Sequence, residues 1–231
     1  MAPMPSELRP LVAPLGLRRS REGGLALHRG SLAGTEVVAA LAGVGLRAAA
    51  ARAERLIDAV APERLVVVGI AGGIGPSMAV GDLVVPEQVE RLATGRRFRP
   101  APFGEHPPRG VLASSDALLE SPVDAARLGE RGIVAIDMET AAVAEACERR
   151  GCPWSVFRAV SDRADDGSTD AAVLGLIDAE GRPIPAAVAR FLVRRPQRIP
   201  QLVRLARGSR AATRAAAGAA IAAIARDGRR P

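Results

Sequence analysis

Acidic side chains follow two apolar segments of the sequence, at positions where they could donate or accept a proton. Asp162 comes after the apolar run that begins at Trp154, in the stretch RAVSDRADD, and Asp137 and Glu139 follow the run IVAI. A carboxyl group held by a rigid strand can act as a general acid or base, a role typically worth ~10²–10⁴-fold in rate. The pattern therefore predicts acid–base chemistry at strand ends.

Several other catalytic chemistries lack the residues they need. The sequence has no lysine, so all 32 basic residues are arginine, and neither a Schiff base nor a P-loop lysine is possible. His28 and His106 lie in polar or Pro-rich surroundings, which disfavours a histidine triad or a multi-histidine metal site. Cys147 and Cys152 have a spacing that zinc and redox motifs do not use, so we interpret both as core residues. We expect neither a metal nor an organic cofactor.

Length and composition indicate one globular domain. The chain has 231 residues, of which 48% are hydrophobic and only 2% aromatic, so we expect a core of aliphatic side chains. We expect a single domain over residues 1–210 and an Ala/Arg-rich helical tail over 211–231. No apolar signal segment is recognisable at the N-terminus, and the longest apolar stretch is shorter than the ~20 residues of a spanning helix. These features predict a cytoplasmic protein.

The net charge of +7 is concentrated in two regions, residues 96–99 and the segment after Arg182. A solvated helical face is one interpretation of the second region, and peripheral contact with an anionic membrane is another. Nucleic acid is not expected as a partner, because almost no aromatic side chain is available for base stacking.

The order of the elements predicts an α/β fold. Residues 35–45 read as a strand ending in a turn, 46–60 as a helix and 65–73 as a second, continuously apolar strand. A strand, a helix and a strand in this order form a βαβ unit with parallel strands covered on both faces. We therefore expect a three-layer α/β/α sandwich around a mixed, largely parallel sheet.

Ligands of such sheets bind beyond the carboxyl ends of the strands. Further strands are expected at 81–87, 110–116, 133–137 and 154–162. Residues 93–109 are expected to form a surface loop, and 165–185 a lid-like connection. The predicted strand ends bring three groups to one crevice: Gly69–Gly75, Asp137–Glu139 and Ser161–Asp162.

Each of these groups also has a purely structural interpretation. The glycines could serve strand–turn packing, and acids near 137–139 could sit at a helix N-terminus, where the helix dipole favours them. Asp162 could be a turn or N-cap residue. We expect at most one of Asp137 and Glu139 to face a given ligand.

The combination is more specific than its parts. The motifs VVVGIAGGIGPSMAVGDLVVPE and AIDMETAAVAEACERRGCPWSVFRAVSDRAD together resemble the purine nucleoside phosphorylase/nucleosidase superfamily, in particular nucleosidases that cleave 5′-methylthioadenosine and S-adenosylhomocysteine. The resemblance covers residues 35–166. The segment LIDAEGRPIPAAVARFLVRRPQRIPQLVRLARGSRAA is similar to the hopanoid-associated phosphorylases of the same superfamily. The resemblance implies a small nucleoside substrate, no metal and a homodimer.

The resemblance also implies residue roles at the purine. Asp162 would be the general acid that protonates N7 of the departing base, because a neutral adenine leaves more easily than its anion. Ser161 would orient Asp162. The backbone at Ala71 and Gly72 would lie near the sugar and the base.

Around the sugar, the resemblance implies two further groups. Glu139 would hold the ribose hydroxyls, and Met138 would pack against the sugar. Met4, Glu7 and Arg158 fall on positions that surround the attacking water in the nucleosidases.

The nucleophile is water or phosphate, and the sequence favours water. The arginine and serine with which bacterial phosphorylases bind phosphate are replaced here by Val67 and Ile70. Ile70 also replaces a serine that nucleosidases use near their water, so phosphorolysis, for example of an adenosyl-hopanoid, stays an alternative. A third alternative is a homologue that binds a nucleoside but catalyses no reaction.

Three departures from the family pattern affect the substrate and the start of the chain. Asp137 replaces a glutamate, and Ser114–Leu119 lacks the aromatic residue that would stack on the base, so adenine is inferred from the family alone. The family's first strand precedes the segment equivalent to MPSEL. We therefore expect either an upstream start or a sheet without its first strand.

Overall fold

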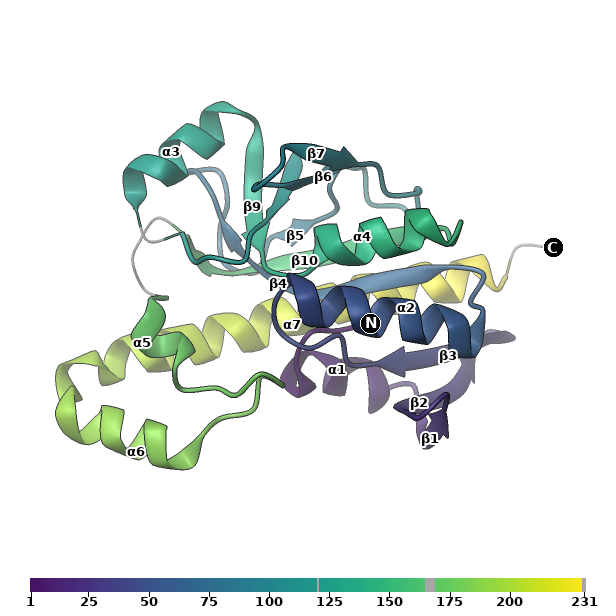
Figure 1. Ribbon diagram of the computed structural model, residues 1–231, viewed down its shortest axis with the longest axis horizontal. Coiled ribbons are helices and arrows are strands. Elements are labelled where there is room, and N and C mark those ends of the chain that lie inside the picture. Colours follow the sequence, from purple (N-terminus) through teal and green to yellow (C-terminus); the bar gives the residue numbers. More distant parts are fainter. Residues whose placement is uncertain (120, 165–168, 230–231) are drawn as a thin grey trace.

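A seven-stranded sheet lies at the centre of the molecule in this computed structural model, which describes residues 1–119, 121–164 and 169–229 (Figure 1). Its strand order is β5-β10-β4-β9-β8-β6-β7. The strands are β4 (Leu65–Gly73), β5 (Leu83–Val84), β6 (Gln88–Arg91), β7 (Arg96–Phe98), β8 (Val111–Ser114), β9 (Ile133–Asp137) and β10 (Trp154–Arg163). The pairs β10–β4, β6–β8 and β8–β9 are parallel, whereas β10–β5, β4–β9 and β6–β7 are antiparallel. The predicted α/β fold with a mixed sheet is confirmed, although the described pairings are divided evenly between the two directions.

Helices cover both faces of this sheet (Figure 1). Helices α2 and α4 pack on one face, and α7 lies along β10 and β4 on the other, with α1 beside it. The helices are α1 (Pro5–Val12), α2 (Leu46–Val60), α3 (Pro122–Glu130), α4 (Thr140–Arg149), α5 (Ala171–Leu174), α6 (Pro185–Arg194), the 3₁₀ turn η1 (Pro196–Arg198) and α7 (Ile199–Asp227). This is the expected arrangement of three layers.

A separate antiparallel sheet contains β1 (Arg18–Glu22), β2 (Leu25–Leu32) and β3 (Thr35–Ala40). The prediction that residues 35–45 and 65–73 form one βαβ unit is therefore only half right, because β3 and β4 flank α2 in the chain but do not pair. The backbone of Met1 and Ala2 lies between them. Ala2 forms a parallel bridge with Leu41, and the amino group of Met1 donates to the carbonyl of Val66 at 2.6 Å.

The C-terminal segment does not separate from the domain at residue 210, where we expected a tail to begin. Helix α7 crosses this position without a break. Its small residues Ala212, Ala216 and Ala220 are fully buried, and they pack in one cluster with Val68 and Phe157. Because they recur every fourth residue, they form one face that allows close approach to the sheet.

The two expected loops contain short regular elements. The segment 93–109 includes β7, which pairs with β6. Of the expected lid, residues 165–168 lie outside the described residues, and the rest contains α5 and a bridge between Ile177 and Pro183. In the described part of the chain, no helix is both long enough and apolar enough to cross a membrane.

Candidate active site

The ends of β4, β9 and β10 enclose a pocket of about 180 Å³. Strand pairing sets Gly72 opposite both Ile136 and Asp162, which brings the three segments to one place. The N-terminal segment and the α5 region complete the wall. The lining includes eight of the nine residues singled out from the sequence: Met4, Glu7, Ala71, Gly72, Met138, Glu139, Ser161 and Asp162.

The ninth residue, Arg158, lies behind the pocket. It contacts the carboxylates of Glu7, Asp137 and Glu139, which we call the floor of the pocket. Its side chain is fully buried, with Nη2 at 2.7 Å from Asp137 Oδ2 and 3.2 Å from Glu139 Oε2, and Nη1 at 3.8 Å from Glu7 Oε1. Nε and Nη2 also donate to the Thr140 hydroxyl, at 3.2 and 3.1 Å. Burial alone would lower the pKa of Arg158, but the three carboxylates raise it above its usual value. The guanidinium therefore stays charged.

Glu7 is held by backbone groups and is buried to 1% exposure. Its Oε1 accepts from the Ile70 amide at 2.8 Å and its Oε2 from the Met4 amide at 2.9 Å. The second bond caps helix α1, because Met4 is the N-cap and Glu7 the third helical residue. Burial raises the pKa of Glu7 to about 7, although Arg158 and the two amides oppose this shift. A carboxyl group of this kind changes its charge near neutral pH.

Gly69 in β4 makes room for the side chains of Glu7 and Arg158. A Cβ at Gly69 would collide with the Arg158 guanidinium and with the Glu7 carboxylate. Gly69 thus allows two charged side chains to pack closely against β4, which requires a residue without a side chain.

Asp137 and Glu139 both face the floor of the pocket, so the expectation that at most one of them would do so is wrong. Strand alternation does not place Glu139, because β9 ends at Asp137 and the chain bends at Met138 and Glu139 before α4 begins. Glu139 Oε1 also accepts from the Gly45 amide at 3.0 Å, and burial raises the pKa of Glu139 to about 7. Asp137 Oδ1 accepts from the Thr140 amide at 3.2 Å, so this acid also caps α4, as its structural interpretation proposed.

Asp162 also lines the pocket and is half-buried. The register of β10 against β4 shifts between Val160 and Asp162, which breaks the regular alternation at this point. One oxygen of Asp162 accepts from the Ser161 hydroxyl, and the other accepts from Thr169 Oγ1 at 2.8 Å. Asp162 and Glu139 therefore line the same pocket.

Much of the remaining lining is aliphatic. Ala117, Leu118 and Leu119 come from the loop after β8, and Leu174 and Ile177 from the segment after residue 168. The loop therefore presents aliphatic side chains where the family pattern has an aromatic one.

Sequence reasoning missed three polar residues of the site. Thr140 contacts both Arg158 and Asp137, and the Ser114 hydroxyl donates to Asp137 at 2.5 Å. Both could have been found, because Thr140 follows the acids directly and Ser114 ends a neighbouring apolar strand. No sequence signal indicates Thr169, which reaches Asp162 from outside the strands.

The arrangement has an electrostatic consequence for any ligand. Three carboxylates surround one guanidinium, so the floor is negative when all of them are ionised. Such a site stabilises positive charge that develops on a bound molecule, and it disfavours a bound dianion.

Comparison with known proteins gives a consistent result. A family model described as the phosphorylase superfamily matches residues 1–109 and 99–193. A 5′-methylthioadenosine/S-adenosylhomocysteine nucleosidase from Chromohalobacter salexigens is 30% identical over 192 residues, which cover 70% of this chain and 82% of that protein.

Two solved structures have the same fold. The 5′-methylthioadenosine/S-adenosylhomocysteine nucleosidase from Neisseria meningitidis, in complex with methylthio-immucillin-A, superposes with a TM-score of 0.71 at 21% identity, covering 97% of this chain and 96% of that one. The futalosine hydrolase of Helicobacter pylori superposes with a TM-score of 0.71 at 19% identity, covering 96% and 94%.

Proposed function

The chain belongs to the phosphorylase superfamily, and from that premise we propose that it hydrolyses the N-glycosidic bond of a purine nucleoside with a modified 5′ end. Adenine is the base we favour. The observation that carries the proposal is the pocket itself, a space of about 180 Å³ whose lining includes Asp162, Glu139 and Glu7.

Asp162 is the proposed general acid. As the bond between C1′ and N9 breaks, its electron pair moves into the purine, and Asp162 transfers a proton to N7. The hydroxyls of Ser161 and Thr169 both donate to the Asp162 carboxylate. They would therefore stabilise the anion that proton transfer leaves behind and would hold it in position.

Glu7 is the proposed base for the attacking water. Its pKa of about 7 suits proton abstraction near neutral pH, since a base works best when its pKa is close to the working pH. The water oxygen bonds to C1′ and its proton passes to Glu7, with Arg158 and Met4 completing the water site. Glu139 would hold the ribose hydroxyls, with Met138 against the sugar, and its carboxylate favours the cationic transition state.

Above a pH of about 7, where Glu7 and Glu139 are ionised, the negative floor supports hydrolysis over phosphorolysis. A phosphate dianion would meet three carboxylates and one guanidinium there. Val67 and Ile70 offer no side-chain donors to compensate for this charge.

The test is to measure adenine release from 5′-methylthioadenosine with and without phosphate. We expect turnover without phosphate, at a rate that phosphate leaves unchanged, and a free sugar as the second product. Turnover that requires phosphate and yields a sugar 1-phosphate would contradict the hydrolase. Nucleoside binding without any turnover would identify a binding protein instead.

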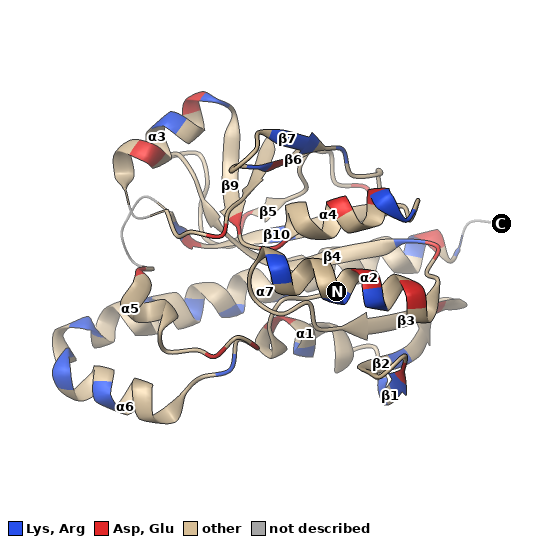
Figure 2. Ribbon diagram, viewed as in Figure 1, with Lys and Arg blue, Asp and Glu red and all other residues tan. Residues whose placement is uncertain are grey.

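We also propose that two copies associate through the α6–α7 region. Val193 is 82% exposed, and Ile199 and Val203 are exposed nearby. Figure 2 shows basic residues along the same helices, an arrangement that could alternatively contact an anionic membrane. Light scattering should give twice the chain mass of 23.9 kDa, whereas a monomer that sediments with anionic vesicles would support the membrane instead.

The cytoplasm is the compartment we propose. Cys147 and Cys152 are both free and buried, which suits a reducing environment. Fractionation of cells that produce the protein tests this assignment, and recovery outside the cytoplasm would contradict it.

A further inference from the structure

The Thr169 hydroxyl reaches the proposed acid from outside the sheet. Its Oγ1 donates to Asp162 Oδ2 at 2.8 Å, and Thr169 lines the pocket together with Leu174. Ser161, which also donates to Asp162, is its neighbour within β10, whereas Thr169 lies beyond the end of that strand. A donor that orients a reacting group must itself be held in position. Something other than a strand must therefore fix Thr169.

The helix that follows Thr169 is too short to provide this support by itself. Helix α5 has four residues, none of them buried, and isolated helices shorter than ~12 residues are marginal in water. Its N-cap is Asp170, whose Oδ1 accepts from the Val173 amide at 3.0 Å. This bond stabilises the first turn, but it joins α5 only to its own flanking residue.

An ion pair joins this segment to the long helix α7. Arg198 Nη1 donates to Asp170 Oδ2 at 2.8 Å, so one carboxylate both caps α5 and binds a guanidinium. Burial alone would raise the pKa of Asp170, but Arg198 and the Val173 amide lower it below its usual value. Asp170 is therefore ionised at neutral pH. Figure 1 shows α5, α6 and the first turns of α7 together at one end of the molecule.

Arg198 differs from the other arginines of this region. Its side chain is 18% exposed, whereas Arg190 and Arg194 lie on the surface. Its Nε donates to Gln201 Oε1 at 2.8 Å, and its guanidinium carbon lies 5.4 Å from the centre of the Phe191 ring. Exposed ion pairs contribute little because they must order two long side chains. These contacts already order Arg198, so less entropy is lost when it binds the carboxylate.

Helix α7 connects Arg198 to the strand that carries the acid. Arg198 is the N-cap of α7, and the helix continues without a break past Gly208, ~15 Å further along its axis. There the helix lies so close to β10 that a Cβ on Gly208 would collide with the Ser161 carbonyl oxygen. The same rigid helix therefore contacts the end of β10 and, through Arg198, the segment that carries the second donor.

We propose that Arg198 and Asp170 are positioning residues for the general acid, because their ion pair holds the donor hydroxyl of Thr169 in place. This inference rests on the proposed function, in which Asp162 protonates the departing base. Negative charge grows on the carboxylate as the proton leaves, and a donor that is already in place stabilises this charge without rearrangement. Loss of the ion pair would therefore slow the step that needs the proton and leave nucleoside binding nearly unchanged.

Three positions are changed to test the proposal. Asp170→Asn removes the charge but keeps a residue that is equally good as an N-cap, so α5 keeps its cap. Arg198→Gln removes the guanidinium, and Arg198→Lys keeps a positive charge and a donor. Thr169→Val removes the hydroxyl but keeps a β-branched side chain.

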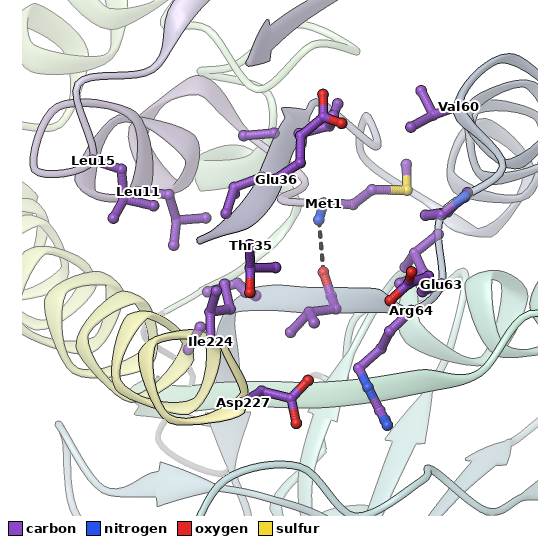
Figure 3. A pocket seen from close by; sticks show the side chains of 18 of the residues that line it. Met1, Leu11, Leu15, Thr35, Glu36, Val60, Glu63, Arg64, Ile224 and Asp227 are labelled. Atoms are coloured by element: carbon purple, nitrogen blue, oxygen red, sulfur yellow. Dashed lines mark hydrogen bonds between the residues drawn. The ribbon is translucent and has the colours of Figure 1, made fainter. Parts of the chain in front are cut away.

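Each half of the ion pair has a matched control. Asp227→Asn changes an exposed carboxylate at the other end of α7, beside a separate cavity of about 530 Å³ (Figure 3). Arg127→Gln breaks an exposed ion pair with Asp124 on α3, in which the two atoms are 3.4 Å apart. Both controls should keep the wild-type rates.

The kinetic test compares two leaving groups. Thr169→Val should lower kcat for 5′-methylthioadenosine by about tenfold, as expected for the loss of one hydrogen bond to a charged group, and should change KM by less than about twofold. Asp170→Asn and Arg198→Gln should lower kcat by about fivefold, and Arg198→Lys should restore part of it. The rate with 4-nitrophenyl β-riboside, whose leaving group needs no proton, should fall by less than about twofold in each variant.

A double variant tests whether the ion pair acts through the hydroxyl. Adding Arg198→Gln to Thr169→Val should lower kcat no further, because the donor that Arg198 positions is already gone. Additive losses in the double variant would overturn the proposal. Equal losses on the two substrates would overturn it as well.

Hydrogen exchange gives a readout that needs no turnover. Amides of residues 171–176 should exchange at least about threefold faster in Arg198→Gln and Asp170→Asn than in the two controls. Unchanged exchange would overturn the proposal whatever the activity. Failure of the proposed function has a different signature, which is a near-normal rate in Asp162→Asn or no turnover by the wild type. The exchange difference would then still show that the ion pair holds the segment.

Discussion

At the scale of single residues, the site consists of carboxyl groups in different environments. Glu7 and Glu139 are buried beside Arg158, and burial raises the pKa of each to about 7. Asp162 is half-buried and accepts two hydroxyl donors. Carboxyl groups that differ in burial and in hydrogen-bond partners are typical of sites that use one acid and one base.

The raised pKa values predict a pH dependence of kcat/KM. A base must be ionised, so activity should fall as the pH drops below about 7 and protonates Glu7. Glu7→Gln should lower kcat by ~10²-fold or more and should change this limb of the pH profile. The matched control is Glu54→Gln, which alters an exposed carboxylate on α2.

The measurement is kcat/KM between pH 5 and 9 for the three proteins. The control should keep the wild-type profile. If Glu7→Gln kept both the rate and the profile, Glu7 would not be the base.

The sequence alone predicted those site residues that lie just beyond the end of a strand. Glu139 and Asp162 were found because each follows an apolar run, and a strand end in an α/β sheet faces ligand. Arg158 and Glu7 were found only through the family resemblance, since nothing local shows that an arginine inside a strand will meet a glutamate 151 positions earlier. Thr169 depends on how a loop folds back, which no local pattern encodes.

At the scale of elements, α7 packs along β10, the strand that carries Asp162. Gly208 lies against the end of β10, where a Cβ would collide with the Ser161 carbonyl oxygen. Ser161 precedes the proposed acid. The close packing of this helix therefore fixes the position of Asp162, although α7 contributes no residue to the pocket lining.

Gly208→Ala should push α7 and the end of β10 apart. We expect a loss of about 1–3 kcal/mol of unfolding free energy from overpacking, together with reduced turnover. Gly218→Ala is the control in the same helix, because a Cβ there has no neighbour within 4 Å, and it should gain about 0.5–1 kcal/mol.

Denaturant unfolding and the rate of adenine release measure both effects. Equal stabilities of the two variants would show that α7 does not constrain β10.

Most elements could be predicted, because their apolar periodicity is strong. The strand runs near 65–73, 133–137 and 154–162 and the helix at 46–60 all appear in the structure. What the sequence did not reveal is that β3 and β4 lie in different sheets. A βαβ pattern predicts parallel strands but does not say whether a third segment separates them.

At the scale of the whole molecule, two sheets share a narrow connection. Among the described residues, β3 is linked to the main sheet by the backbone of Met1 and Ala2. The boundary expected at residue 210 does not exist as a structural break, because the Ala stripe of α7 is part of the core. Composition alone suggested a tail, but alanines on one face are typical of close helix packing.

This connection predicts uneven stability. The three-stranded sheet should open at lower free energy than β4 and β10, because few buried contacts join it to the main core. Hydrogen exchange measured by mass spectrometry should show residues 18–40 exchanging at least tenfold faster than residues 65–73 and 154–160. Uniform protection across both sheets would contradict this view of the fold.

The proposed reaction depends most on proton donation by Asp162, and a comparison of leaving groups tests this role directly. Asp162→Asn should slow adenine release from 5′-methylthioadenosine by ~10²–10⁴-fold. It should slow cleavage of 4-nitrophenyl β-riboside, whose leaving group departs without a proton, by less than about tenfold if the acid contributes only its proton. Asp58→Asn, at a surface ion pair, is the matched control and should leave both rates unchanged. Equal losses on both substrates, or a near-normal rate on the nucleoside, would contradict the role of Asp162 as the acid.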